Sequence, residues 1–447
     1  MRGTREFLFY LSVGVGMALS CSAFMMVGGL FQVTTLFWAL VALALGGLLC
    51  SVLAQSIGEL AGMYPSSPAI VTYFKAAFGE RAALAFVYLY LIFVVLIAGV
   101  ESYLFALVMR ALFPGFPALA IVVVMIVCVV AVNLLGLEFP RGLQMGLTGV
   151  AAALIVVLGI AGVANAPGDL QHAAGVGDLG GGLAALPAAV GIAVFIYMGF
   201  EWVTPIGLRP ASYARLIPLS MPVAVVILAV AYGVFSSGIG ANVARARLTD
   251  DLTPQLTYLR ELLGRTGTYL AAFLSLSAIA STFNAGVMGA SRLVYAVARD
   301  RHLPSWCAAM RVETGVPYGA VLLLGSLGIA SAFFVVSLGI ELVAAVIGAA
   351  IVCLIYAAYM VAVLRLRQSD PDRARPYRTA VPSGFQWAVI VLLVVIGIAT
   401  LFSLPDRWIS CVAGLVVATA AAIALSRWSM RRRGRAPLTP RRLEPTS

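Results

Sequence analysis

The chain has 447 residues, of which 62% are hydrophobic and 11% charged, with a mean hydropathy of +1.03. This composition excludes a water-soluble globular protein, because apolar stretches of about 20 residues, long enough to cross a bilayer core, recur along the whole chain. The net charge of +11 does not indicate a nucleic-acid partner, since the positive-inside rule explains it better. The sequence therefore predicts an all-α polytopic membrane protein.

About twelve transmembrane helices are predicted from the apolar runs. The predicted spans cover residues 7–31, 34–57, 82–112, 117–136, 142–165, 187–207, 216–240, 268–299, 317–336, 339–366, 384–404 and 407–428. With the N-terminus in the cytoplasm, most of the 29 basic residues fall in inner loops and tails. We therefore expect a multi-pass protein of the cytoplasmic (inner) membrane with both termini cytoplasmic. The first span is too long for a cleavable leader and should be retained.

The sequence predicts no enzyme, cofactor or metal centre. Each of the six cysteines lies in a span or, for Cys307, in a cytoplasmic loop, so no disulfide framework is expected. His172 and His302 fall on opposite sides of the predicted membrane, which excludes a shared metal site. Acidic, histidine and cysteine residues form no cluster at catalytic spacing. Function is therefore expected where the apolar runs are interrupted.

The first interruption lies midway through the first span. Small residues gather there, with Gly14 and Gly16 followed by Ser20, Cys21 and Ser22. Glycine and serine hold a helix poorly, and serine side chains can serve freed backbone groups. The pattern favours a helix break, although close packing through small residues is the alternative.

The third span carries an acid, Glu101. At about 1.5 Å per residue it lies about 28 Å along from Ala82, which predicts a position in the outer half of the membrane or close to its surface. One interpretation is a carboxylate hydrogen-bonded to its neighbours near the interface. The other is an acid of the outer vestibule that attracts a cationic substrate or titrates.

The sixth span places Gly199, Glu201 and Pro205 inside an apolar stretch. Glycine and proline favour local unwinding, and an acid in hydrocarbon is costly unless it faces the bundle or water. A break in one span and another five spans later is typical of a five-plus-five inverted repeat. The two sites together favour broken helices over packing alone.

The eighth span carries a polar cluster. Ser277, Ser281, Thr282 and Asn284 lie within two turns of one helix. Hydrogen bonds between helices would explain them. The alternative is a sodium site at Ser281 and Thr282, since hydroxyls supply the oxygen ligands that a hard cation prefers.

Several motifs resemble those of one transporter family. They are ELAGMYPSS at 59–67, YFKAAFG at 73–79, GFE at 199–201, SRLVYAVARD at 291–300 and RPYR at 375–378. In this order and spacing they resemble the amino acid–polyamine–organocation (APC) transporters, over roughly residues 7–430. The resemblance implies a leucine-transporter-type fold, with helices 1–5 at 7–165, helices 6–10 at 187–367 and peripheral helices at 384–428. Short cytoplasmic segments, 1–6 and the basic tail 429–447, flank these parts.

The resemblance also implies a substrate site. Free N–H groups after the first break would hold a substrate carboxylate, while free carbonyls of spans one and six would hold an ammonium. The segment where the family has a Gly-Ser-Gly turn is here Ser20, Cys21, Ser22 and Ala23. Phe195 matches the aromatic gate position, and Met198 and Gly199 fall in the unwound stretch beside Glu201.

Two departures from the family pattern bear on the site. The Ser-Cys-Ser turn adds bulk where the family has glycines. Many members carry a proposed proton-carrying lysine about seven residues after the glutamine here numbered Gln144, and this chain has Ala151 there. Coupling is then left to exchange without an ion, to sodium in span eight, or to protonation of Glu201; Glu101 and Asn284 are further gating candidates.

The sequence thus predicts a secondary transporter of amino acids that works by alternating access. An amine or polyamine transporter or antiporter of the same fold is the alternative, because Glu101 and Glu201 add acids that would favour a cation. A transporter-like sensor or a channel is less favoured, since the chain shows no cytoplasmic signalling domain and no continuous polar pore stripe. The expected partners are a small-molecule amino acid or amine, the lipid bilayer, and a proton or sodium ion.

Overall fold

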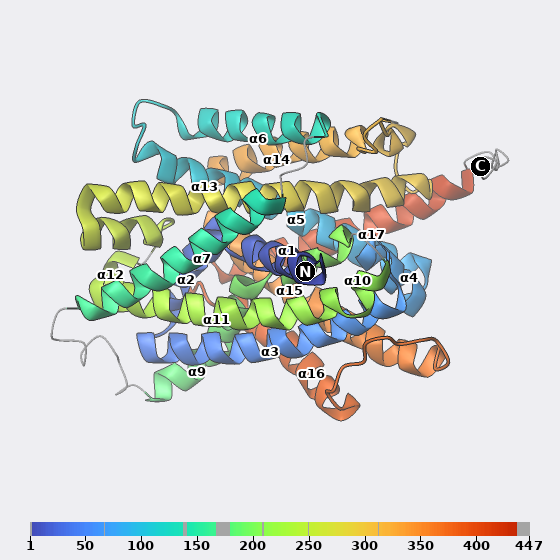
Figure 1. The fold of residues 1–447 in the computed structure, drawn as a ribbon, viewed down its shortest axis with the longest axis horizontal. Coiled ribbons are helices and arrows are strands. Elements are labelled where there is room, and N and C mark those ends of the chain that lie inside the picture. The colour runs from blue at the N-terminus through green and yellow to red at the C-terminus, as the bar shows by residue number, and fades with distance from the viewer. Residues whose placement is uncertain are drawn as a thin grey trace.

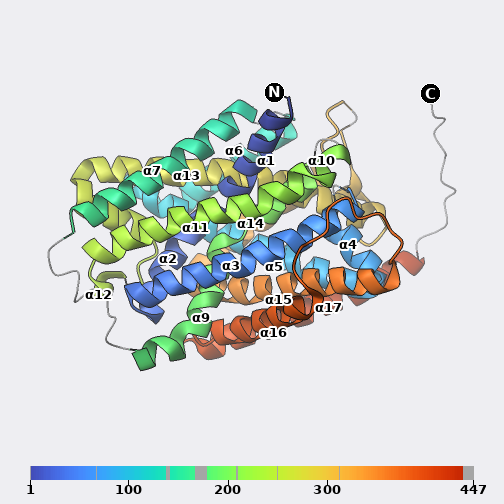
Figure 2. The same ribbon diagram turned by 60° about the horizontal axis from the view of Figure 1, so that its bottom comes forward.

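The computed structural model describes residues 2–66, 68–136, 141–166, 179–207, 210–248, 250–311 and 313–435. Over these residues the chain is helical and contains no strand. The long helices run roughly along one direction and form a bundle, with α4 at one end and α12 at the other (Figures 1 and 2). Three parts of the sequence-based prediction lie outside the described residues: His172, most of the 166–186 loop, and residues 436–447 of the basic tail.

The first half of the described chain contains eight α-helices and a 3-10 helix. They are α1 (Arg2–Ala18), α2 (Cys21–Val33), α3 (Leu36–Met63), α4 (Ala69–Phe78), α5 (Glu80–Arg110), α6 (Ala118–Leu134), α7 (Arg141–Ala164), α9 (Leu179–Tyr197) and the 3-10 helix η1 (Phe200–Ile206).

The second half continues in the same way. Its helices are α10 (Pro210–Ala214), α11 (Leu216–Asn242), α12 (Arg245–Leu248), α13 (Pro254–Arg299), η2 (Ser305–Ala308), α14 (Tyr318–Leu338), α15 (Glu341–Ser369), α16 (Ser383–Thr400) and α17 (Trp408–Arg435).

The structure contains nearly as many candidate membrane spans as the twelve predicted, but it does not establish their exact number. In the described part of the chain, ten helices are long and apolar enough to cross a membrane, and the bent pair α1–α2 makes an eleventh if it counts as one span. Helix α6 is apolar but has only 17 residues. Twelve spans therefore remains a prediction.

The bundle buries its middle and leaves apolar faces outside. Helix α15 is buried along most of its length, whereas α7, α16 and α17 expose large apolar side chains such as Val157, Val391 and Val417. Apolar side chains on an outer face suit contact with lipid, where water is absent. These outer faces agree with the prediction of a membrane-embedded bundle.

Helix α13 is two helices joined at a glycine. Gly264 has φ 57° and ψ −130°, outside the helical region, so a short helix from Pro254 precedes the long span. Glycine adopts this positive φ without the steric cost that a Cβ would bring. The predicted span over 268–299 begins after this glycine.

Candidate functional site

The first span is interrupted at its middle. Helix α1 ends at Ala18 and α2 begins at Cys21, and the two helix axes differ by 52°. Ser20 lies between them in an extended conformation, and its hydroxyl accepts a hydrogen bond from the Ala23 N–H at 3.1 Å. Serine is a favoured N-cap because its oxygen satisfies one of the free N–H groups of a helix start. The sequence of this turn therefore starts a new helix inside the span.

The carboxylate of Glu101, on α5, lies against the start of α2. One oxygen accepts the Cys21 N–H at 2.9 Å, and the other accepts the Ser22 N–H at 3.0 Å together with the Ser22 hydroxyl. A helix N-terminus attracts an anion because its N–H groups are free and its dipole is positive there. The N–H groups predicted to hold a substrate carboxylate thus already bind a carboxylate of the protein.

The structure places Glu101 at the first helix break. It was expected in the outer half of the membrane or close to its surface, either hydrogen-bonded to its neighbours or lining an outer vestibule. The structure shows it 2% exposed and hydrogen-bonded at the break between α1 and α2. Helix α5 has 31 residues, which at 1.5 Å each is about 46 Å, well over the ~30 Å of a bilayer core. A residue count from the predicted start of such a helix therefore does not by itself fix the depth of Glu101.

The second interruption separates α9 from η1. Helix α9 ends at Tyr197, and Gly199 follows with φ 126° before the 3-10 turns that contain Pro205. A Cβ on Gly199 would lie 2.8 Å from the backbone nitrogen of Ala18, so the two breaks touch. Only glycine fits both the positive φ and the close approach.

The second break has a carboxylate of its own. Glu201 is 3% exposed and accepts hydrogen bonds from the Gly199 N–H at 3.0 Å, the Tyr356 hydroxyl at 2.9 Å and the Tyr90 hydroxyl at 3.4 Å. A buried carboxylate is tolerated when donors satisfy it. Sequence reasoning missed both tyrosines, because a tyrosine in an apolar run carries no signal of its partner.

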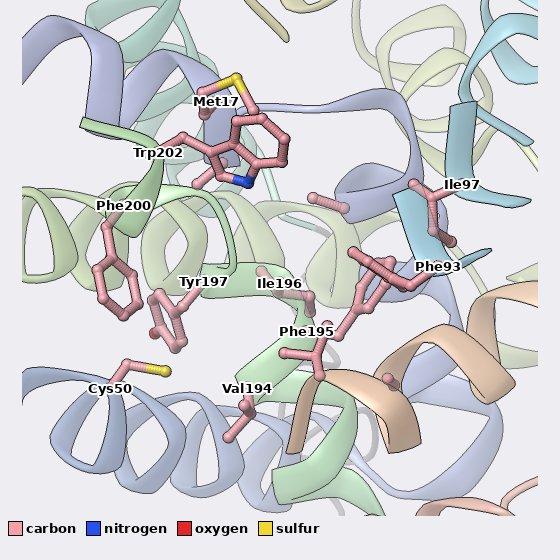
Figure 3. Close-up of a cluster of buried hydrophobic side chains, with 14 of the residues drawn as sticks. Met17, Cys50, Phe93, Ile97, Val194, Phe195, Ile196, Tyr197, Phe200 and Trp202 are labelled. Carbon is pink, nitrogen blue, oxygen red and sulfur yellow. The ribbon is translucent and has the colours of Figure 1, made fainter. Parts of the chain in front are cut away.

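A cavity of about 100 Å³, here called the central cavity, lies beside the two breaks. Its polar lining comes from Ser20, Ser22, Glu101 and Thr282, while its walls are largely apolar and aromatic. Phe93 and Phe195 meet edge to face with their centroids 6.5 Å apart. Figure 3 shows these two rings near Ile97, with Met17 and Trp202 on another side of the cluster.

The remaining predicted residues are divided between this cavity and its surroundings. Met198 lines the central cavity, whereas Cys21 and Ala23 are buried behind the break and do not line it. The Cys21 thiol contacts the carbonyl of Ser275 at 3.9 Å. Glu201 borders a separate, smaller cavity with Tyr90 and Tyr359. The structure thus brings only part of the predicted substrate set to one space.

The polar cluster of α13 does not converge on one point. Thr282 lines the central cavity, and its hydroxyl has no hydrogen-bond partner among the described residues. Ser281 faces a different, narrow cavity, where it accepts the Gln144 side-chain amide at 3.2 Å. Asn284 borders a third, larger cavity of about 360 Å³. A sodium site formed by Ser281 and Thr282 stays a prediction.

Ala151 lines the same narrow cavity as Ser281. Gln144 donates there to both Thr148, at 3.3 Å, and Ser281. Near Ala151, where many family members carry a lysine, the polar contacts between α7 and α13 are thus made by neutral groups, the Gln144 amide and the Thr148 hydroxyl.

Ion pairs hold the α4 end of the bundle together. Glu59 at the end of α3 is 0% exposed, pairs with Arg367 at 2.6 Å and with Arg375 at 3.6 Å, and accepts the Thr379 N–H at 3.0 Å. Burial raises the pKa of the nearby Tyr377 hydroxyl, and the negative charge of Glu59 raises it further. Two of the cytoplasmic-loop arginines predicted from the sequence, Arg367 and Arg375, therefore bind one buried acid.

A second network joins α4, α5 and the end of α13. Lys75 pairs with Asp300 and lies 3.7 Å from Glu80, which also contacts the ring of His302 at 3.1 Å. Three of these residues belong to, or directly follow, motif stretches recognised in the sequence. The sequence revealed the motifs but not which charges pair.

Comparisons with known proteins agree on a transporter. A family model described as amino acid permease matches residues 11–428. An uncharacterised transporter of Mycobacterium bovis is 25% identical over 298 residues, 64% of each chain. L-asparagine permease 1 of Mycobacterium tuberculosis is 22% identical over 290 residues, 62% of this chain and 59% of its own length. The chain thus matches less than two thirds of the length of these curated relatives.

A solved structure shares the fold. The manganese transporter of Eremococcus coleocola superposes with a TM-score of 0.63 at 14% identity, over 96% of this chain and 95% of that one. At this identity the likeness shows the fold alone, which is of the leucine-transporter type.

Proposed function

Because the chain belongs to the amino acid permease family, we propose that it is a secondary transporter that moves amino acids or closely related amines by alternating access. The observation that carries this proposal is the central cavity beside two helix breaks that touch each other. Transporters of this architecture bind substrate near the bilayer midplane at discontinuous helices. The substrate would lie against Ser20, Ser22, Met198 and Phe195.

Phe195 is proposed to gate the cavity on one side. Its ring contacts Phe93 on α5, so the two aromatic side chains must separate or rotate together when substrate passes. Toward the α4 end, the pairs of Glu59 with Arg367 and Arg375 tie α3 to α15 and the loop after it. Opening at that end would require these contacts to rearrange.

Coupling is proposed to involve protonation of Glu201. This acid lies at the second break, beside a small cavity, with two tyrosine hydroxyls on it. Access of water from one side and then the other would let it take up and release a proton on different faces. Sodium at the hydroxyls of α13 and exchange without an ion are the competing schemes.

Counterflow in proteoliposomes tests the function. Vesicles containing the purified protein and loaded with an unlabelled amino acid or amine should transiently accumulate the same labelled compound from outside. A Gly199→Val variant should abolish accumulation, because its side chain would press into α1 at the break. Gly149→Val, at an exposed position of α7 with open space around its Cβ, is the matched control. No accumulation of any amino acid or amine by folded protein would refute the proposal.

A further inference from the structure

Glu101 narrows the class of substrate. Resting on the proposed function of the central cavity, we infer that the substrate is an organic monoamine without a carboxylate, bound as its ammonium form by Glu101. Glu101 already occupies the hydrogen-bond donors at the first helix break, and its negative charge lines the cavity.

The donors at the start of α2 are all engaged. The N–H groups of Cys21 and Ser22 and the hydroxyl of Ser22 bind Glu101, and the N–H of Ala23 binds Ser20. These are the groups that a substrate carboxylate would need at a helix N-terminus. An amino acid would therefore have to displace a buried side chain that makes three hydrogen bonds.

A second carboxylate beside the first would also be repelled. Glu101 is only 2% exposed where it lines the cavity, and like charges a few ångströms apart interact strongly where water is excluded. An ammonium group has the opposite requirement. A carboxylate offers about four acceptor positions. Cys21 and Ser22 use three of them, and the Ser20 hydroxyl also interacts with Glu101, so a ligand ammonium would share or replace the contact with Ser20.

The rest of the cavity suits the body of an apolar amine. Among the described lining residues, Glu101 is the one ionisable side chain. Phe93, Phe195 and Trp202 present aromatic surface, which attracts a cation and packs against alkyl or aryl groups. The hydroxyl of Thr282, which has no partner in the described part of the chain, offers one more acceptor. A polyamine would need an acid for its second ammonium, and the lining supplies none among the described residues.

Matched pairs of ligands test the substrate class. Purified protein would be screened by thermal shift and by competition in counterflow with leucine against 3-methylbutylamine, phenylalanine against phenethylamine, and putrescine. The monoamines should raise the melting temperature and compete. The parent amino acids should do neither, even at about a hundredfold higher concentration, because their carboxylate would face the buried carboxylate of Glu101. Putrescine should bind more weakly than the monoamines.

Variants at Glu101 separate recognition from folding. Glu101→Gln keeps the shape and loses the charge, so monoamine affinity should fall about tenfold or more, the scale of a buried charged hydrogen bond. Glu101→Ala frees the N–H groups of α2 and should let leucine bind while monoamines no longer do. Glu341→Gln, an acid at the start of α15 that does not line the cavity, is the control and should bind like the unchanged protein.

The outcomes distinguish the two proposals. Binding and counterflow of amino acids, with none for their decarboxylated amines, would overturn the monoamine inference and leave the transport function standing. If Glu101→Gln binds monoamines as well as the unchanged protein does, the role of Glu101 is wrong. If folded protein binds and transports neither class, the proposed function itself fails, and the inference fails with it.

Discussion

Glu101 and Glu201, the acids at the two helix breaks, have different surroundings. Glu101 binds backbone N–H groups and a serine and lines the central cavity, whereas Glu201 binds one N–H group and two tyrosines beside another cavity. Each satisfies the free donors of a broken helix. Of the two, Glu101 alone lines the central cavity, which is why we propose Glu201 as the coupling residue.

The proton proposal predicts a specific effect of Glu201→Gln. The amide resembles the protonated acid, so the variant should still bind substrate but transport at a rate that no longer changes with pH. Uptake into proteoliposomes measured across pH at fixed sodium checks this. In the control, the sodium concentration is varied at fixed pH for the unchanged protein and for Ser281→Ala. If transport follows sodium and Glu201→Gln remains pH-dependent, the sodium scheme replaces the proton scheme.

At Gly199 we predict that even one methyl group is harmful. Gly199→Ala combines a positive φ, which costs of order 1–3 kcal/mol for a residue with a side chain, with a Cβ 2.8 Å from the Ala18 nitrogen. The melting temperature should fall and counterflow should be largely lost. Gly149→Ala, on an open face of α7, should be neutral or slightly stabilising, because alanine favours a helix. Equal behaviour of the two variants would contradict the contact between the breaks.

At the scale of elements, the ends of α3 and α15 are held together by charge. Glu59 has no exposed surface, and the arginines that bind it are 14% and 12% exposed. Removing one partner of a buried ion pair commonly costs about 3 kcal/mol or more, because the other charge stays buried without compensation. These contacts should therefore resist opening at the α4 end.

Glu59→Gln is predicted to weaken this closure. The melting temperature should drop, and a cysteine placed at Ile57, buried in α3, should react faster with a water-soluble maleimide in the Glu59→Gln background. Glu341→Gln, which removes an acid from the first residue of α15, is the control. Unchanged melting and labelling in Glu59→Gln would show that the ion pairs do not hold this end closed.

At the scale of the whole molecule, the arginine asymmetry predicts the orientation in the membrane. A single cysteine at Arg265, exposed near the α12 end, should react with an impermeant reagent added outside intact cells. A cysteine at Asp372, exposed at the α4 end, should react only after permeabilisation. Both variants require a background without the native cysteines. Labelling of position 372 from outside would show that the orientation is opposite to the predicted one.

The sequence by itself determined the membrane class and the fold type. Long apolar runs leave a chain little choice but helices that satisfy their own backbone in lipid. The small-residue turn at 20–22 and the glycine and proline of span six also indicated where those helices break. These features are local, since each depends on residues a few positions apart.

The tertiary structure decided which groups meet. Glu101 is 80 positions from Cys21 in the chain, yet its carboxylate occupies the start of α2. Glu201 meets Tyr356 across 155 positions, and Ser281 and Thr282 face different cavities although they are adjacent. A hydropathy pattern fixes that a helix crosses the membrane, but its tilt, depth and rotation come from packing against its neighbours. The identity of the helix-capping anion, and with it the charge offered to a substrate, is therefore a property of the folded bundle.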